Sequence, residues 1–116
     1  MTVCEKLCDI LDEMNLPVAE GSYNGTSTEY FTFNIFSEHC VLFADNEIID
    51  DVSELYLHYF TKDKTHSNKT KIKKLLRNNE DVYVLDTEIL YEKDTGYTHV
   101  IFQLQIINDT EERNDD

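Results

Sequence analysis

Apolar and polar side chains largely alternate in the stretch Thr98-His99-Val100-Ile101-Phe102-Gln103-Leu104-Gln105-Ile106-Ile107. The even-numbered positions from Val100 to Ile106 are all apolar, and the odd-numbered positions from His99 to Gln105 are mostly polar. Successive side chains of a β-strand point to opposite faces, so this pattern predicts a strand with one buried face. The opposite face, with its His and Gln side chains, is predicted to meet solvent or another protein.

Three other segments are predicted strands on similar grounds: Glu29–Phe36, Val52–Thr61 and Val82–Glu92. Asp94-Thr95-Gly96 is predicted to join the last two strands as a hairpin turn, because Gly tolerates the positive φ that such turns need. The segment Ser37–Asp51 is ambiguous, with Ala44-Asp45-Asn46 as a turn candidate inside it. Helical spacing of apolar residues predicts one helix over Thr2–Asn15 and a second over Ser67–Asn78.

Two features sharpen the helix predictions. Thr2 and Glu5 match a capping box at the first helix, and Ser67 is the predicted N-cap of the second. The resulting order is α-β-β-α-β-β. We therefore predict an α+β fold in which an antiparallel four-stranded sheet carries both helices on one face.

The length and composition fit one domain. The chain has 116 residues, of which 41% are hydrophobic and 11% aromatic. Residues 1–107 are predicted to form a single α+β domain, and residues 108–116 a disordered acidic tail without apolar side chains. An odd number of cysteines and the absence of a secretory signal at the start of the sequence point to a reducing compartment.

The net charge of −14 disfavours general nucleic-acid binding, which needs Lys and Arg at the phosphates, and disfavours anionic membranes. Seven of the basic residues nevertheless fall in one window with a single acid, which gives it a charge of +6 and leaves −20 for the remainder. They are Lys62, Lys64, Lys69, Lys71, Lys73, Lys74 and Arg77. Copies of such a chain can meet head to tail, although a solvated lysine-rich helix is the simpler interpretation.

The polar faces of the predicted strands are rich in Tyr and His, a composition that suits contact with another chain. Two exposed sheet edges would favour oligomerisation as well. The candidate partner or oligomer contacts are Tyr30, Thr32, Tyr56, His58, Phe60, Lys62, Lys64, Lys69, Lys73, Tyr97, His99 and Gln103.

No catalytic motif appears in the sequence. Cys4, Cys8, His39 and Cys40 could supply four zinc ligands, but without the tight spacing of structural sites we expect ordinary buried cysteines. His58 and His99 could face each other across strands and titrate near neutrality, although ordinary histidines on a sheet surface are the simpler expectation. The acidic groups Asp50-Asp51, Asp45/Glu47 and Glu88/Glu92 could hold a hard cation, although solvated carboxylates are the simpler expectation. We therefore predict no catalytic residue, metal or cofactor.

From about Leu7 to Ile107 the chain resembles the tail-terminator and tail-completion proteins, or head–tail joining proteins, of long-tailed bacteriophages and prophages. The resemblance rests on the order of several short signals. They are Leu16-Pro17-Val18-Ala19 with Gly21 after the first helix, Tyr30-Phe31-Thr32-Phe33, Phe43-Ala44-Asp45-Asn46, Tyr59-Phe60-Thr61-Lys62-Asp63-Lys64, and a last hairpin with Tyr91 and Tyr97. Thr28-Glu29, where a proline often stands, and the unusually basic second helix depart from the pattern.

The resemblance implies a structural protein of the virion with no enzymatic activity. Its copies would form a ring, usually a hexamer, at the head-proximal end of the tail. The ring would stop polymerisation of the tail tube and dock onto the head connector or completion proteins, after assembly in the host cytoplasm. DNA would pass through its lumen without specific binding, and acidic residues facing the lumen would repel the phosphates.

Two alternatives remain open at this point. The charge and length fit equally well a small acidic inhibitor or immunity-type protein that mimics nucleic acid and binds a basic partner, although the basic window weakens such mimicry. An enzyme is the third possibility, but the sequence contains no recognisable constellation for it.

Overall fold

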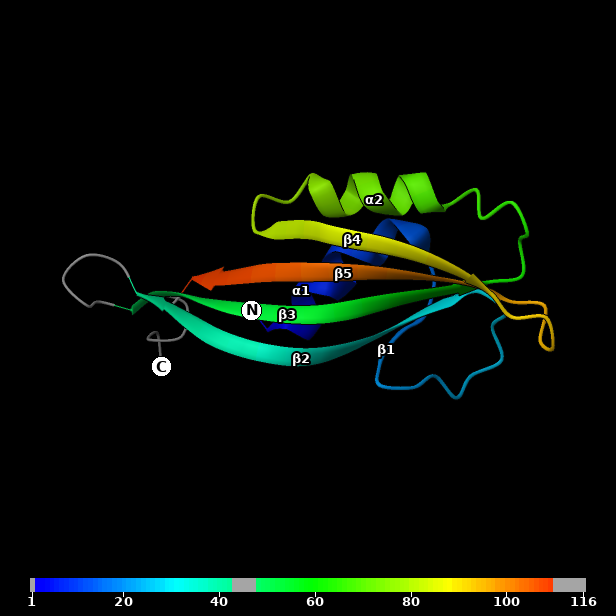
Figure 1. Cartoon of the computed structure of the whole chain (residues 1–116), viewed down its shortest axis with the longest axis horizontal. Coiled ribbons are helices and arrows are strands. Elements are labelled where there is room, and N and C mark those ends of the chain that lie inside the picture. Colours follow the sequence, from blue (N-terminus) through cyan, green and yellow to red (C-terminus); the bar gives the residue numbers. More distant parts are fainter. Residues whose placement is uncertain (1, 43–47, 110–116) are drawn as a thin grey trace.

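The computed structural model describes residues 2–42 and 48–109. In chain order the elements are α1 (Val3–Leu11), the 3-10 turn η1 (Asp12–Met14), β1 (Val18–Glu20), β2 (Tyr30–Leu42), β3 (Ile48–Thr61), α2 (Lys69–Arg77), β4 (Val82–Tyr91) and β5 (Thr98–Asp109). The strands form one five-stranded sheet in the order β1-β2-β3-β5-β4 (Figure 1).

The predicted four-stranded antiparallel sheet is therefore wrong. A fifth strand, β1, lies at the edge and runs parallel to β2, with Val18 opposite Phe31, so the sheet is mixed. The Phe31 N–H donates to the Pro17 carbonyl at 2.8 Å and the Gly21 N–H to the Phe33 carbonyl at 2.9 Å, which fixes both ends of this short strand. Gly21 has a φ of +81°, a conformation that Gly adopts without strain and that ends the strand.

Strands β2 and β3 are longer than predicted and take up most of the ambiguous segment. A register shift between Ile35 and Ser37 places a β-bulge at Phe36, where the prediction ended the strand. A bulge inserts one residue and reverses the alternation of faces beyond it, which hides a continuing strand from a period-two search. The turn candidate Ala44-Asp45-Asn46 lies outside the described residues.

The end of β5 corrects the predicted tail boundary. Asn108 and Asp109, predicted to begin a disordered tail, pair in β5 with Asp51 and Asp50 of β3. The rest of the predicted tail, 110–116, lies outside the described residues.

The capping box of α1 is confirmed: the Glu5 N–H donates to Thr2 Oγ1 at 3.1 Å, and the Thr2 N–H to Glu5 Oε1 at 3.4 Å. Ser67 as the N-cap of α2 is wrong. Asn68 holds that position without a side-chain cap, and Ser67 Oγ instead donates to Asp63 Oδ2 at 2.8 Å. The loop before α2 thus uses Ser67 to fold on itself.

Both helices cover the same face of the sheet. Leu7 and Leu11 of α1 and Ile72 and Leu76 of α2 are buried in one cluster with sheet residues. The sheet residues of this cluster are Phe31, Phe33, Leu55, Leu57, Tyr59, Val82, Val100, Phe102, Leu104 and Ile106. Each large apolar side chain buried there contributes about 1.5–3 kcal/mol. No described helix is long and apolar enough to cross a membrane.

Candidate interaction surface

The sheet face turned away from the helices, here called the open face, carries no helix among residues 2–42 and 48–109. The strand register assigns to it Tyr30, Thr32, Asn34, Tyr56, His58, Phe60, Asp86, Glu88, Leu90, His99, Ile101 and Gln103. Most of these side chains are half-buried or exposed. Thr32 is the exception, because it lies between β1 and β3 and is only 6% exposed, so it offers little to a partner.

Four aromatic rings form a row across one end of the open face. Tyr23 stacks on Tyr30 at 4.5 Å between ring centroids, Tyr30 on Phe60 at 4.9 Å, and Phe60 on His99 at 4.1 Å. Tyr97 meets Tyr30 and Phe60 edge-on. Rings already held by their neighbours lose little freedom when another protein packs on them.

His99, the last ring of this row, and His58 belong to a series of hydrogen bonds. His58 Nε2 lies 2.9 Å from the Asn34 Oδ1, which only accepts, so this nitrogen carries the proton. His58 Nδ1 must then accept from His99 Nε2, 2.8 Å away. His99 Nδ1 is left unprotonated in the neutral pair and lies 3.8 Å from Glu92 Oε2. The two histidines thus do face each other, which the sequence raised as a possibility, although ordinary surface histidines were the simpler expectation.

Burial lowers the pKa of both histidines. The pKa of His58 is lowered first by loss of solvent and then by the charge of His99. Burial likewise lowers the pKa of His99, and the Glu92 carboxylate opposes part of this effect. The neutral pair is therefore the form that the folded chain favours near neutral pH.

Replacing both histidines by Gln is expected to flatten the acid side of the stability profile. A histidine whose pKa is lowered by folding binds more protons when unfolded, so it destabilises the fold as pH falls below about 6.5. We expect the wild-type Tm to fall by a few degrees between about pH 7 and about pH 5.5. The Tm of the His58→Gln/His99→Gln variant should not show this decrease. His66→Gln, a change in a loop, is the matched control. A double variant with the wild-type slope would contradict the assignment.

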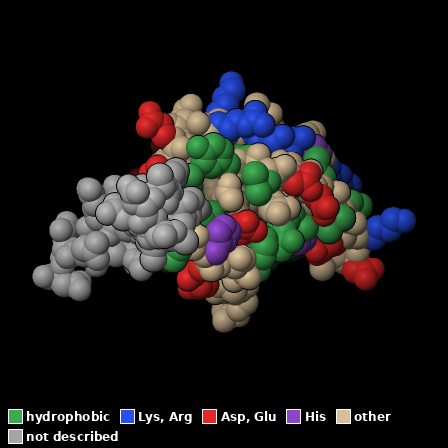
Figure 2. Space-filling view, turned by 60° about the vertical axis from the view of Figure 1, so that its left-hand side comes forward, with side chains coloured by type: hydrophobic (Ala, Val, Ile, Leu, Met, Phe, Trp, Pro, Cys, Tyr) green, Lys and Arg blue, Asp and Glu red, His purple; other side chains and the backbone are tan. Residues whose placement is uncertain are grey.

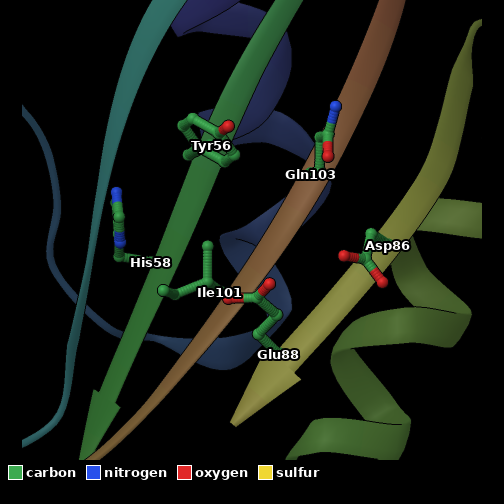
Figure 3. A pocket seen from close by; sticks show the side chains of 6 residues that line it. All are labelled: Tyr56, His58, Asp86, Glu88, Ile101 and Gln103. Atoms are coloured by element: carbon green, nitrogen blue, oxygen red, sulfur yellow. The ribbon is translucent and has the colours of Figure 1, made fainter. Parts of the chain in front are cut away.

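A shallow pocket of about 250 Å³ lies beside His58 on the open face (Figure 3). Figure 3 shows Tyr56 and His58 on β3, Ile101 and Gln103 on β5, and Asp86 and Glu88 on β4. The bulge at Leu85 brings both carboxylates to this face, since they are opposite Gln103 and Ile101. Neither carboxylate has a basic partner within the described part of the chain, so the pocket suits a Lys or Arg side chain.

The structure does not bring together the four zinc-ligand candidates considered from the sequence. Cys4 and Cys8 lie on α1, and Cys40 lies on β2, where its Sγ donates to Asp51 Oδ1 at 3.2 Å. No group of residues suited to a metal ion occurs in the described ranges. The expectation of buried cysteines is also wrong, because all three are exposed. Among the candidate cation pairs, Glu92 instead faces His99, and Asp45 and Glu47 fall outside the description.

Helix α2 carries its basic side chains beside β4, along the upper rim of the molecule (Figures 1 and 2). Within the residues that the structure describes, no carboxylate pairs with the basic residues of α2, which are Lys69, Lys71, Lys73, Lys74 and Arg77. Thr65 and Ser67 donate to the Asp63 carboxylate, which lowers its pKa well below the usual range. The single acid of the basic window is thus engaged in its own loop.

The predicted contact residues therefore fall into two groups. The first comprises open-face residues of the strands and Tyr97, whose ring contacts Tyr30 and Phe60 there: Tyr30, Tyr56, His58, Phe60, Tyr97, His99 and Gln103. The second comprises Lys64, Lys69 and Lys73 of the loop and α2, while Lys62 connects the groups because its Nζ lies 5.2 Å from the Tyr97 ring centroid. Sequence reasoning missed Tyr23 and Asp86, and it considered Glu88 only as a possible cation ligand together with Glu92, not as a neighbour of Asp86. Only a strand alternation corrected for the bulge could have found these acids.

Compared with known proteins, the chain matches no family model and no curated protein sequence.

Proposed function

We propose that this chain is a virion structural protein of the head–tail interface of a long-tailed bacteriophage or prophage, a tail terminator or tail-completion protein. Its copies form a ring, a hexamer as in the family that it resembles. This ring ends tail-tube polymerisation and joins the tail to the head connector. The observation that carries the proposal is the open face, where pre-packed aromatic rings and an acidic pocket occupy one side of a thin sheet.

The shape and charge of the chain support a role in assembly. The described chain is elongated, with principal extents of 53 × 26 × 23 Å, and one helical layer covers a single sheet. Such a thin subunit leaves much of its sheet for contacts with neighbours. The acidic excess outside the basic window supports a lumen that DNA phosphates slide past without binding.

Tail tubes polymerised from a major tail protein provide the test. We expect the purified chain to appear as a cap at one end of the tubes in negative-stain electron micrographs and to stop their elongation. Asp86→Lys/Glu88→Lys is expected to weaken capping, because it reverses the charge of the open-face pocket. Asp9→Lys/Glu13→Lys, the same charge change at exposed positions of α1 and η1, is the matched control.

Two results would contradict this function. Tubes that elongate equally with and without the chain would remove the terminator role. Salt-sensitive one-to-one binding to a basic nuclease, together with no effect on tubes, would favour the acidic inhibitor instead. The nuclease measurement is therefore made with the same protein preparation.

A further inference from the structure

The sheet has two edges that the described residues leave unpaired over similar lengths. At one edge, β4 pairs only with β5 and offers its outer side over 10 residues. At the other edge, β1 covers β2 only as far as Phe33. No described strand pairs with the outer side of β2 from Asn34 to Leu42. A free edge of this kind can accept a strand from another chain.

The large exposed apolar side chains gather at these two edges. Five of them are on β4: Tyr83, Leu85, Ile89, Leu90 and Tyr91, each between 43% and 52% exposed. The sixth, Phe36, is 45% exposed and occupies the bulge within the free part of β2. Single exposed apolar residues are common, but a row of them along an unpaired edge marks a contact surface.

Strand directions make the two edges compatible. Each of the neighbouring pairs β2–β3, β3–β5 and β5–β4 is antiparallel, so β4 runs opposite to β2. A second copy placed beside the first in the same orientation would therefore set its β2 antiparallel to β4. The sheet would continue from copy to copy with the helices on one face, and such head-to-tail contacts generate rings or filaments.

Charge distinguishes this arrangement from a symmetric pairing of two β4 edges. Helix α2 lies along β4, so an antiparallel β4–β4 pair would place two basic helices side by side on one face. The β2 edge presents acids on that same face. Glu38 is opposite Ser53, Glu20 is opposite Phe33, and both glutamates are exposed. Basic α2 against this acidic edge is attractive, whereas α2 against α2 is repulsive.

We propose that the β4 edge and basic α2 of one copy dock on the outer edge of β2 in the next copy, antiparallel, with α2 beside Glu20 and Glu38. The inference rests on the proposed function for its partner, a second copy in a ring. It also accounts for the basic helix as the cationic half of the subunit contact.

Charge reversal on each side provides the test. One variant carries Lys71→Glu/Lys74→Glu on α2, and the other carries Glu20→Lys/Glu38→Lys on the β1–β2 edge; all four side chains are exposed. Light scattering coupled to size exclusion at low salt should show oligomers of the wild type. Each variant alone should associate about tenfold more weakly, which corresponds to about 1.4 kcal/mol. An equimolar mixture of the two should regain wild-type association, because each contact then joins opposite charges.

Asp9→Lys/Glu13→Lys should associate like the wild type, and circular dichroism should show that all variants fold. A mixture that stays dissociated, or an α2 variant that associates best with the wild type, would overturn the contact, as would a monomeric wild type. Variants that cap tail tubes like the wild type would overturn the contact and leave the terminator function intact. If the mixture regains association but the wild type does not cap tail tubes, the subunit contact would stand and the terminator function would be overturned.

Discussion

Phe102→Ala is expected to lower the free energy of unfolding by about 3–5 kcal/mol, much of the total for a domain of this size. Phe102 lies in β5 between β3 and β4, opposite Leu57 and Thr87, and is fully buried under the helices. Truncation removes the ring from the centre of the core and leaves a cavity that five packed strands cannot close. Urea unfolding followed by far-UV circular dichroism measures the loss.

Phe36→Ala provides the matched control with the same chemical change. Phe36 is half-exposed at the β2 bulge and stacks on Tyr56 with ring centroids 4.7 Å apart. Its removal should cost only about 0.5–1.5 kcal/mol, the value of an aromatic pair. Equal losses for the two variants would contradict the assignment of helix-covered and open faces.

Tyr59→Phe is the second large effect, expected to cost about 1–3 kcal/mol. The fully buried Tyr59 donates its hydroxyl proton to Glu29 Oε2. Asn68 Nδ2 donates to the same Glu29 oxygen at 2.9 Å and to the Tyr59 hydroxyl at 3.3 Å. In the variant, Glu29 and Asn68 each lose a hydrogen bond to the Tyr59 hydroxyl. Because Asn68 directly precedes α2, the attachment of α2 to the sheet should also weaken.

An alkaline titration separates this effect from a simple loss of packing. Burial, followed by the hydrogen bond to Glu29, raises the pKa of Tyr59 to about 12. A tyrosine whose pKa is raised by folding stabilises the chain below its unfolded pKa of about 10, and that stability is lost as pH rises through the folded pKa. Between these values the wild type should lose stability faster than Tyr59→Phe. Tyr91→Phe, on the exposed edge, should follow the wild type, and parallel curves for all three would contradict the role of the hydroxyl.

The sequence was sufficient to predict features that depend on an uninterrupted period. The two faces of β5 follow from alternation alone. Alternation also made a contact between His58 and His99 possible, but only the sheet order, which places β3 beside β5, decides it. The turn before β5 was predictable for a local reason, since Gly96 has the positive φ of +76° that its position requires.

Other features were hidden because they depend on partners remote in sequence. Strand β1 has three residues, too few to show a period, and it exists because β2 lies beside it. The bulges at Phe36 and Leu85 interrupt the alternation. The continuation of β2 and the sheet face on which Asp86 lies are therefore evident only from the register with the neighbouring strands. That β5 is the only described strand beside β4 is likewise a property of the sheet order, which the sequence of Val82–Tyr91 alone does not determine.

The shortness of β1 also limits where an added strand can start. Beyond Glu20 the chain turns away at Gly21, so a strand arriving along β2 can extend toward Phe33 only until it meets β1. In the proposed contact, the position of one subunit along this edge of the next would therefore have a fixed limit, set by main-chain geometry rather than by any particular side chain. Lengthening β1 by two residues would shorten the part of β2 that is left for an added strand, without changing the side chains that β2 presents there.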